Sequence, residues 1–376
     1  MARLFVVATP LQMLVAQQLV RQQKIEDAIL LESYFSKHPD FLDSYEVCRI
    51  DELWKKRLEP VCDFPSWDYG GANLHKSAFG TWKKYRRLKR ILRENSIDSI
   101  YLADFQNQTY RFMAVLFSKQ GYNVNFYEEG YSHYVPRVCF LHTGIIWKIK
   151  EKILDLLYYL PIYHVRFAHW RNNPNCPSIG LPIANRYSIV PGFHHETYDH
   201  PLLCQPMLSK KLEEYLSSCV DASSSCKRYL LLTDPMSEVL DLKFKHYYFD
   251  IVQDVAKKMD ENSILYVKFH PRETVGDKKK TIMLLEQLGI SYKVLSSKIN
   301  IPVEYFLLNL KFEEIFFFNT STFFYNGYLF PKCRFTKLLP RLYKLCAEHN
   351  APEHNLEQMR LLIDKMNKMK QDAYEN

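Results

Sequence analysis

The chain has 376 residues, of which 47% are hydrophobic and 24% charged, and this length and balance predict globular material with room for two cores. Aromatic residues make up 15% and glycines number only 11, which excludes fibrous and disordered classes. Lys and Arg number 50 against 42 Asp and Glu, a net charge of +8, which indicates an anionic partner without distinguishing nucleic acid, lipid head groups or an anionic substrate.

The cysteines favour a reducing compartment. There are nine, at scattered spacings and without a CxxC pair, so we expect neither a disulfide framework nor a zinc site. The N-terminal apolar run is too short for a signal peptide and is interpreted as a first strand. Since no run of about 20 apolar residues exists, we expect no membrane-spanning segment.

The first half alternates strands with helices. In chain order, we expect a strand at 3–8, a helix at 11–23, a strand at 27–33, a helix at 80–96, a strand at 97–104, a helix at 107–121 ended by Gly121, and a strand ending at Tyr127. This alternation is typical of a doubly wound α/β domain. The middle is less regular, with a basic-rimmed helix expected at 145–161.

The pattern restarts after a polar linker at 221–228. We expect strands within 229–232, 263–269, 292–296 and 313–318, helices at 245–259, 279–289 and 302–310, the start of a helix after the last strand, and a helical tail from 351. The sequence therefore predicts an α/β protein of GT-B type, with two Rossmann-like domains facing across a cleft. The domains are an acceptor-side domain at 1–220 and a donor-binding domain with a helical tail at 221–376.

Polar residues follow several of the expected strands. They are Thr9 and Gln12, Glu128 and Glu129, Thr233 and Asp234, His270, and Asn319 to Thr322. Ligands of open α/β sheets bind beyond the carboxyl ends of the strands. Five such clusters in two halves therefore indicate a ligand site between the halves.

The stretch KFHPRE places His270 at a strand end, where Pro271 fixes the chain. Imidazole there can face a phosphate as a cation or act as a general acid, and Arg272 can support an anion. A strand-end histidine satisfied by backbone groups is the structural alternative.

Two further segments have both a structural and a functional interpretation. In NTST, Thr320, Ser321 and Thr322 are good helix caps, and the same helix start is also suited to a phosphate. Glu304 near the start of a short helix favours the helix dipole or accepts two ribose hydroxyls.

Glu128 and Glu129 are adjacent like charges followed by Gly130. They form either a solvated turn or a group in which one carboxylate accepts or donates a proton. Gly130 lets the backbone turn close to a sugar.

The ordered set EEG, HP and NTST resembles the three short motifs of bacterial sialyltransferases. These families include the capsule polysialyltransferases and the lipooligosaccharide sialyltransferases. ATPLQ after the first strand and LLLTDPMSE are similar to the lipooligosaccharide branch, and IPVE resembles the family's nucleoside-binding segment. The landmarks span nearly the whole chain.

The resemblance implies an enzyme that transfers sialic acid, or a related nonulosonic acid, from a CMP-sugar to a hydroxyl of a bacterial surface glycan, capsule or lipooligosaccharide. It implies that Glu129 is the general base and that His270 meets the CMP phosphate and helps it leave. Ser321 and Thr322 would hold that phosphate, and Glu304 the ribose. The remaining donor-side candidates are Thr9, Gln12, Thr233, Arg272, Asn319 and Thr320, with Glu128, Gly130 and Pro271 as secondary residues.

The chemistry is consistent with these residue types. Departure of CMP leaves an oxocarbenium-like centre and a phosphate dianion, which require a base on one side and cations or N–H donors on the other. No DxD motif follows a strand, so we expect no metal and no cofactor besides the CMP-sugar co-substrate. We interpret the HHETYDH run at 194–200 as a surface cluster rather than a zinc site.

The basic stretches at 82–93 and 147–152 have no nucleic-acid module around them. We expect no nucleic-acid partner, and a cytoplasmic enzyme that is peripheral at the inner face of the membrane. The motifs leave open pseudaminic, legionaminic and Kdo donors, the acceptor, the linkage and its stereochemistry, processivity and oligomeric state, and Glu128 as the base. A non-catalytic protein that binds membranes or polyanions is the alternative from another class.

Overall fold

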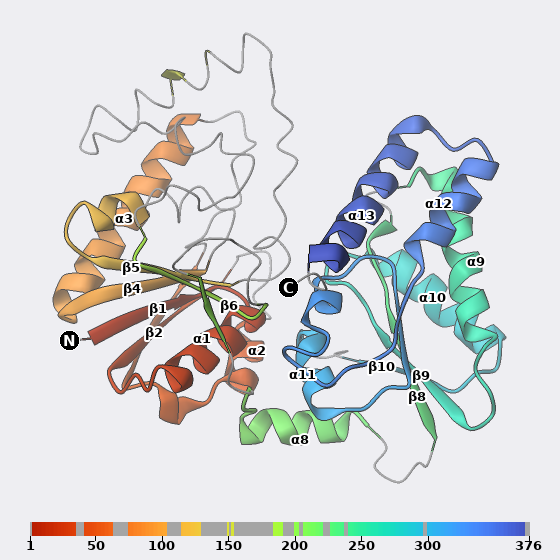
Figure 1. The fold of residues 1–376 in the computed structure, drawn as a ribbon, viewed down its shortest axis with the longest axis horizontal. Helices are drawn as coiled ribbons and strands as arrows, with labels where there is room; N and C mark the ends of the chain where they lie inside the picture. The colour runs from red at the N-terminus through yellow and green to blue at the C-terminus, as the bar shows by residue number, and fades with distance from the viewer. Residues whose placement is uncertain are drawn as a thin grey trace. The chain divides into compact units, whose positions relative to one another are not determined.

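The chain forms two compact units, Met1–Ser209 and Lys210–Asn376, in a computed structural model (Figure 1). The structure describes residues 2–34, 41–62, 74–103, 114–128, 149, 152–153, 183–190, 199–202, 206–220, 226–236, 240–295 and 299–372. The boundary falls before α8 (Lys210–Ser218), which contacts α11 (Val303–Asn309) of the second unit. The sequence had placed the boundary later, between residues 220 and 221.

The described strands of the first unit form a seven-stranded parallel sheet in the order β3-β2-β1-β4-β5-β6-β7. They are β1 (Ala2–Val7), β2 (Ala28–Tyr34), β3 (Lys56–Cys62), β4 (Ile97–Ala103), β5 (Asn123–Tyr127), β6 (Asn185–Ser188) and β7 (Asp199–Pro201). The chain runs outward from β1 to β3 and then returns to β4 on the other side of β1. This reversal is the topological switch point of a Rossmann-like unit.

Local sequence explains the start of this unit. In β1, the side chains from Leu4 to Val7 are fully buried, as expected of a central parallel strand covered on both faces. Thr9 then caps α1 (Pro10–Gln22) by accepting the N–H of Gln12 at 3.2 Å, and Pro10 occupies the first helical turn. The other described helical segments of the unit are α2 (Phe41–Cys48), the 3-10 turn η1 (Asp51–Leu53), α3 (Leu74–Glu94) and residues 114–118.

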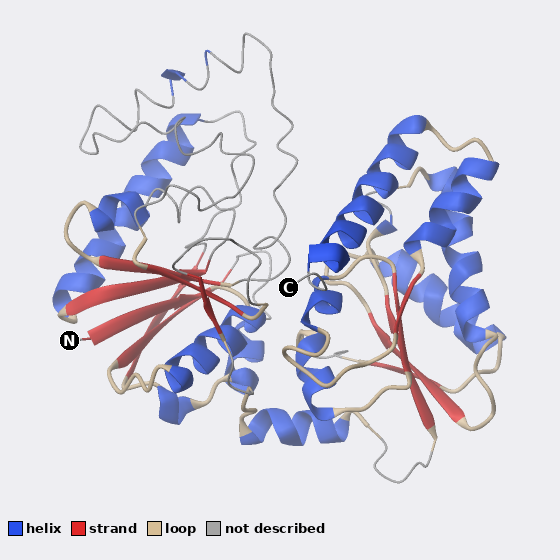
Figure 2. Cartoon of the chain, in the orientation of Figure 1, coloured by secondary structure: helices blue, strands red, loops and turns tan. Residues whose placement is uncertain are grey.

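The second unit has a five-stranded parallel sheet in the order β10-β9-β8-β11-β12. The strands are β8 (Lys227–Leu232), β9 (Ser263–Lys268), β10 (Tyr292–Val294), β11 (Glu314–Phe317) and β12 (Phe335–Lys337). Between and after them lie α8, η4 (Leu242–Phe244), α9 (Lys245–Ala256), α10 (Val275–Gln287), α11, η5 (Ser321–Tyr325), α12 (Leu339–Glu348) and α13 (Glu353–Asp372). Helices lie on both faces of the sheet (Figure 2), which again is a doubly wound arrangement.

The alternating α/β pattern and two Rossmann-like units predicted from the sequence are confirmed. Gly121 ends its helical segment with a φ of +85°, the left-handed conformation that glycine adopts without cost. The sequence analysis did not predict β3, β6, β7, β12, α2, α8 and α12, most of which are short, polar or contain a proline. The expected helix after β11 is only the five-residue 3-10 turn η5. The helix expected at 145–161 lies almost entirely outside the described residues.

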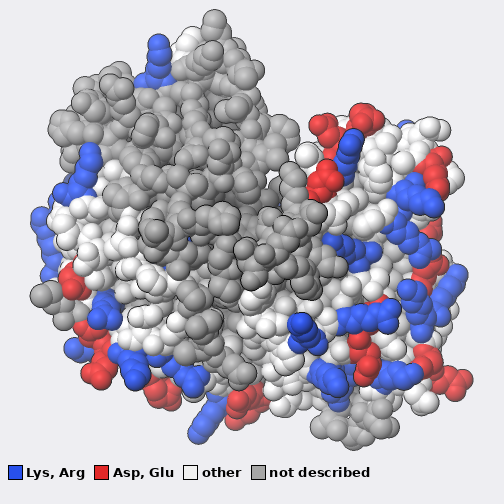
Figure 3. All heavy atoms as spheres, in the orientation of Figure 1, with Lys and Arg blue, Asp and Glu red and all other residues white. Residues whose placement is uncertain are grey.

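Three general features follow. No helix in the described part of the chain is long and apolar enough to cross a membrane. Cys48, Cys219, Cys226, Cys333 and Cys346 are free thiols. Lysine and arginine side chains are interspersed with aspartate and glutamate over the visible face of the second unit (Figure 3), so the net positive charge is not gathered into one patch there.

Candidate active site

The register of the second sheet brings three strand ends together. Leu232, the last residue of β8, pairs with Lys268 at the end of β9 and with Phe317 at the end of β11. The residues that follow these strands therefore start from neighbouring points on one edge. This edge lies at the topological switch point beside β8, where open α/β sheets bind ligands.

The turn after β9 is fixed by a buried carboxylate. Glu273 accepts the backbone N–H of His270 at 2.8 Å and the hydroxyl hydrogen of Thr233 on the same oxygen. The backbone N–H of Glu273 donates in turn to the carbonyl of His270 at 3.0 Å. The imidazole Nδ1 of His270 accepts the N–H of Arg272 at 3.1 Å. Thr233 and His270, both predicted from the sequence, are thus brought together.

The electrostatics of this turn are unusual. Burial lowers the pKa of His270 to about 4, and three cations act in the same direction: Arg272, Lys268 and Lys278. Burial raises the pKa of Glu273 to about 7, against its hydrogen bonds to Thr233 and His270. The histidine is therefore neutral near pH 7, whereas the glutamate is poised between its two charge states.

Lys268 supplies a partly desolvated cation at the same edge. Its pKa is lowered to about 8 by burial, against the attraction of Glu304. Its Nζ donates to the side-chain oxygen of Asn300 at 3.5 Å. Burial makes the charged form of this lysine unfavourable, and a nearby anion offsets that cost. The position therefore suits an anionic ligand.

Glu304 and the NTST segment form a second group of contacts. The Glu304 side chain is buried and accepts the hydroxyl hydrogen of Thr322 at 2.7 Å, and burial raises its pKa. The hydroxyl of Thr320 donates to that of Thr322 at 2.9 Å and accepts its N–H at 3.3 Å. Ser321 and Asn319 are half-buried beside them. Thr320 is the cap of η5, so the capping interpretation holds, and the roles of Glu304 and Thr322 toward a ribose and a phosphate stay predictions.

The first-unit candidates are placed as follows. Thr9 and Gln12 lie at the carboxyl end of β1, where Gln12 accepts the backbone N–H of Ala8 at 2.6 Å and is buried. Both side chains therefore stabilise the turn into α1. Glu128 directly follows β5, is fully buried, and accepts the backbone N–H of Ile189 at 2.6 Å. Glu129 and Gly130 lie outside the described residues.

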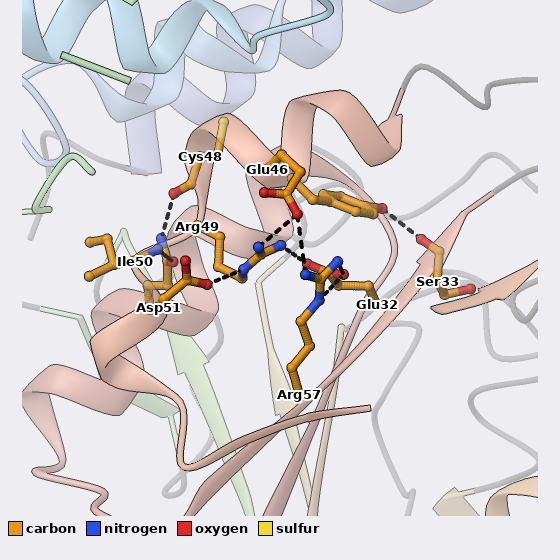
Figure 4. Close-up of polar contacts among 10 residues, drawn as sticks. Glu32, Ser33, Glu46, Cys48, Arg49, Ile50, Asp51 and Arg57 are labelled. Atoms are coloured by element: carbon orange, nitrogen blue, oxygen red, sulfur yellow. Dashed lines mark hydrogen bonds and ion pairs between the residues drawn. The ribbon is translucent and has the colours of Figure 1, made fainter. Parts of the chain in front are cut away.

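A separate charged network stabilises the first unit (Figure 4). Glu32 of β2 is fully buried and binds Arg49 at 2.7 Å and Arg57 of β3 at 2.8 Å. Glu46 of α2 binds Arg49 at 3.0 Å, a hydrogen bond that lowers the pKa of Glu46 to about 2. Asp51 of η1 binds the third nitrogen of Arg49. Because each charged side chain has an oppositely charged partner within the network, its role is to join β2, α2 and β3.

Two residues at this edge of the second sheet, Lys268 and Glu273, were not predicted from the sequence. Both stand in KFHPRE, one as the last strand residue and the other three positions after His270, the spacing at which a carboxylate reaches back to a backbone N–H. In the part of the chain that the structure describes, no group of three or more His, Cys, Asp or Glu is arranged to hold a metal ion.

Two Rossmann-like units in one chain, with polar side chains at the strand ends, are the architecture of the GT-B fold class. A sequence model of the alpha-2,8-polysialyltransferase family (POLYST) matches residues 3–338. The chain belongs to this family, and the resemblance to bacterial sialyltransferases is confirmed. Among curated proteins, none matches the sequence.

Solved structures resemble the fold at low sequence identity. Spinosyn rhamnosyltransferase SpnG is 10% identical, with 99% of this chain and 92% of that chain covered and a TM-score of 0.46. The glycotransferase of kitacinnamycin is 11% identical, with 98% and 95% covered and a TM-score of 0.48. The UDP-GlcNAc 2-epimerase from Methanocaldococcus jannaschii is 12% identical, with 84% and 78% covered and a TM-score of 0.42.

Proposed function

We propose that this glycosyltransferase moves sialic acid, or a related nonulosonic acid, from its CMP-activated form to a hydroxyl of a bacterial surface glycan. The observation that carries the proposal is the family match over residues 3–338. The gathering of Thr233, Lys268 and His270 at one edge of the second sheet supports it. That edge combines a cation with hydrogen-bond donors, which suits a nucleotide phosphate.

The reaction divides between an acceptor side and a donor side. On the acceptor side, Glu129 takes the proton of the attacking hydroxyl, in the role that its motif implies. Glu128 is the less suitable base because its buried carboxylate already accepts the N–H of Ile189. On the donor side, the leaving phosphate is held by His270, Lys268 and Ser321.

A nucleotide-binding measurement tests this proposal. CMP, added to the full chain in a thermal-unfolding assay, should raise the midpoint by several degrees at 100-fold excess over Kd, since such binding contributes about 2.7 kcal/mol. His270→Ala should reduce the shift, and Glu129→Gln should leave the shift but abolish turnover. If CMP and CMP-sugars leave the midpoint unchanged while anionic vesicles bind, the chain is not such a transferase.

The donor and linkage follow from one further experiment. The chain is offered CMP-sialic acid, CMP-pseudaminic acid, CMP-legionaminic acid and CMP-Kdo in turn, and the product linkage is read by NMR. We expect turnover with a nonulosonic acid donor. Because the donor side is built from a lysine, a histidine and hydroxyl groups, the proposal includes no metal, and turnover should persist in excess EDTA.

The basic face of α3 supports a peripheral location at the inner face of the cytoplasmic membrane. Tyr85, Leu88 and Leu92 are buried, and the exposed described positions from 83 to 93 are all cationic: Lys83, Arg86, Arg87, Arg90 and Arg93. Each such charge contributes about 1 kcal/mol at an anionic lipid surface. Reversing Arg87, Arg90 and Arg93 to glutamate should abolish sedimentation with phosphatidylglycerol vesicles at low salt; unchanged sedimentation would refute this location.

A further inference from the structure

The contacts around His270 determine where the proton of its imidazole ring resides. Its Nδ1 accepts the backbone N–H of Arg272 at 3.1 Å. A ring nitrogen that accepts a hydrogen bond carries no proton, so the neutral ring bears its hydrogen on Nε2. Protonating Nδ1 would set two N–H groups against each other and break this contact.

Glu273 fixes the backbone that makes this arrangement possible. It is 6% exposed, and its Oε2 receives both the His270 N–H and the Thr233 hydroxyl hydrogen. Its other oxygen, Oε1, has no hydrogen-bond partner among the residues that the structure describes. The carboxyl group therefore makes its contacts through a single oxygen, which joins the end of β8 to the turn after β9.

The charged neighbours of both groups lie on several elements. His270 is faced by Lys268 of β9, Arg272 of the same turn and Lys278 of α10. Glu273 is faced by Lys278 and Asp277 of α10, and Tyr248 of α9 lies near Glu273 and near Asp234 after β8. Cations thus surround the histidine and disfavour the imidazolium, in agreement with its lowered pKa.

We propose that Glu273 is a positioning residue which, with Thr233, holds His270 as a neutral donor through Nε2–H to the departing phosphate. The inference rests on the proposed function in that His270 faces the CMP phosphate. In the transfer step, the anomeric C–O bond breaks and its electron pair stays on the phosphate oxygen. The acceptor oxygen forms the new bond and gives its proton to the base. CMP leaves as a dianion, whose second pKa is about 6, so the leaving group requires no proton from His270.

The first test observes the ring directly and needs no substrate. The full chain, labelled with 15N-histidine, is recorded in long-range proton–nitrogen spectra between about pH 5 and pH 8, and His270→Asn identifies the signal among the 13 histidines. We expect the neutral Nε2–H form throughout. A ring that titrates near its ordinary pKa of about 6.5, or that carries Nδ1–H, would overturn the proposal.

Three substitutions separate a positioning role from simple structural support. Glu273→Gln keeps an acceptor oxygen for His270 and Thr233 and should retain the wild-type tautomer, whereas Glu273→Ala should give a mixture of the two tautomers. An unchanged His270 spectrum in Glu273→Ala would refute the role of Glu273. Thr233→Val removes the hydroxyl contacts to Glu273, the His270 N–H and the Lys268 carbonyl but leaves the contact of Glu273 to the His270 N–H, so it should give an intermediate spectrum.

Turnover supplies the second test. His270→Gln carries a neutral N–H near the position of Nε2 and should retain more activity than His270→Ala, which we expect to lose about 100-fold in kcat. Equal losses in the two variants, or loss of activity above about pH 6.5 in the wild type, would indicate a general acid and contradict the inference. If CMP fails to bind at all, the proposed function fails while the spectra still decide the positioning role.

Discussion

At the residue scale, buried carboxyl groups in this chain have different surroundings and different consequences. Glu32 is matched by two arginines, whereas Glu273 is held mainly by neutral donors and has a pKa raised to about 7 by burial. Because the pKa of Glu273 is raised, the stability of its unit depends on pH.

Replacing Glu273 tests this dependence. The folded pKa of about 7 lies above the unfolded value of 4.5, so the contribution of Glu273 to stability is fully present below pH 4.5 and is lost as the pH rises through 7. Glu273→Gln mimics the protonated acid. Its free energy of unfolding relative to that of the wild type should therefore rise by up to about 3 kcal/mol between about pH 5 and pH 8.5. Urea unfolding at the two pH values measures this difference.

The control for that measurement is Glu261→Gln, because Glu261 is exposed in the turn before β9. Its effect should be small and equal at both pH values. If the free-energy difference between Glu273→Gln and wild type were also equal at both pH values, the Glu273 carboxyl would not be perturbed as described.

The arginines of the Glu32 network offer a matched comparison. Arg49 is 3% exposed and contacts three carboxylates, whereas Arg57 is 38% exposed. Arg49→Met should destabilise the first unit by about 3–5 kcal/mol, because it leaves buried charge poorly compensated. Arg57→Met should cost about 1 kcal/mol or less, since solvent screens an exposed partner.

Denaturant unfolding of the two variants and of the double variant Arg49→Met/Glu32→Gln checks this reasoning. Removing the buried charge together with its partner should recover part of the loss, which is the coupling that a double-mutant cycle measures. If the double variant is no more stable than Arg49→Met alone, charge burial is not the cause of the loss.

At the element scale, the sequence predicted most strands that are continuous apolar runs and missed those that are not. RLFVV and EIFFF are recognisable because both faces of a central parallel strand are buried. β3, with the sequence KRLEPVC, alternates charge with apolar residues and contains a proline, and β12 is only three residues long. Their pairing is decided by the neighbouring strands, which local sequence does not encode.

For the candidate site, the sequence predicts which residues follow the strands but not the contacts that they make. Strand-end residues such as Thr233 and His270 follow from topology alone, because carboxyl ends of parallel strands meet at one edge. The contacts among them do not, since the reach of Glu273 back to His270 and of Thr322 to Glu304 depends on turns of particular shape. The helix expected after β11 is only the short 3-10 turn η5, and the role of this segment toward a phosphate stays a prediction.

Replacing either of two glycines by alanine should change the free energy of unfolding, with opposite signs at the two positions. Gly121 has a φ of +85°, so Gly121→Ala should destabilise the first unit by about 1 kcal/mol although no atom obstructs the new Cβ. Gly276 lies in the first turn of α10, where a Cβ meets only the Thr274 hydroxyl at 3.8 Å. There, Gly276→Ala should stabilise the second unit by about 0.4–1 kcal/mol. Equal signs in urea unfolding would contradict the conformational argument.

At the scale of the whole molecule, the two units have different assigned tasks. The proposed donor-side residues Thr233, Lys268 and His270 lie in the second unit, and the proposed base Glu129 lies in the first. CMP without the transferred nonulosonic acid should therefore bind the second unit. It presents a nucleobase, a ribose and a phosphate, but it has no anomeric carbon that could react on the acceptor side.

Hydrogen exchange with CMP tests this division of labour in the full chain. At a CMP concentration of 100 times Kd, amides that open only when the ligand leaves should exchange about 100-fold more slowly. We expect this protection in the segments that follow β8, β9 and β11 and at the start of α11, and weaker protection in His270→Ala. Protection confined to the first unit, around the ends of β1 and β5, would place the nucleotide on the other unit and overturn the assignment of the donor site.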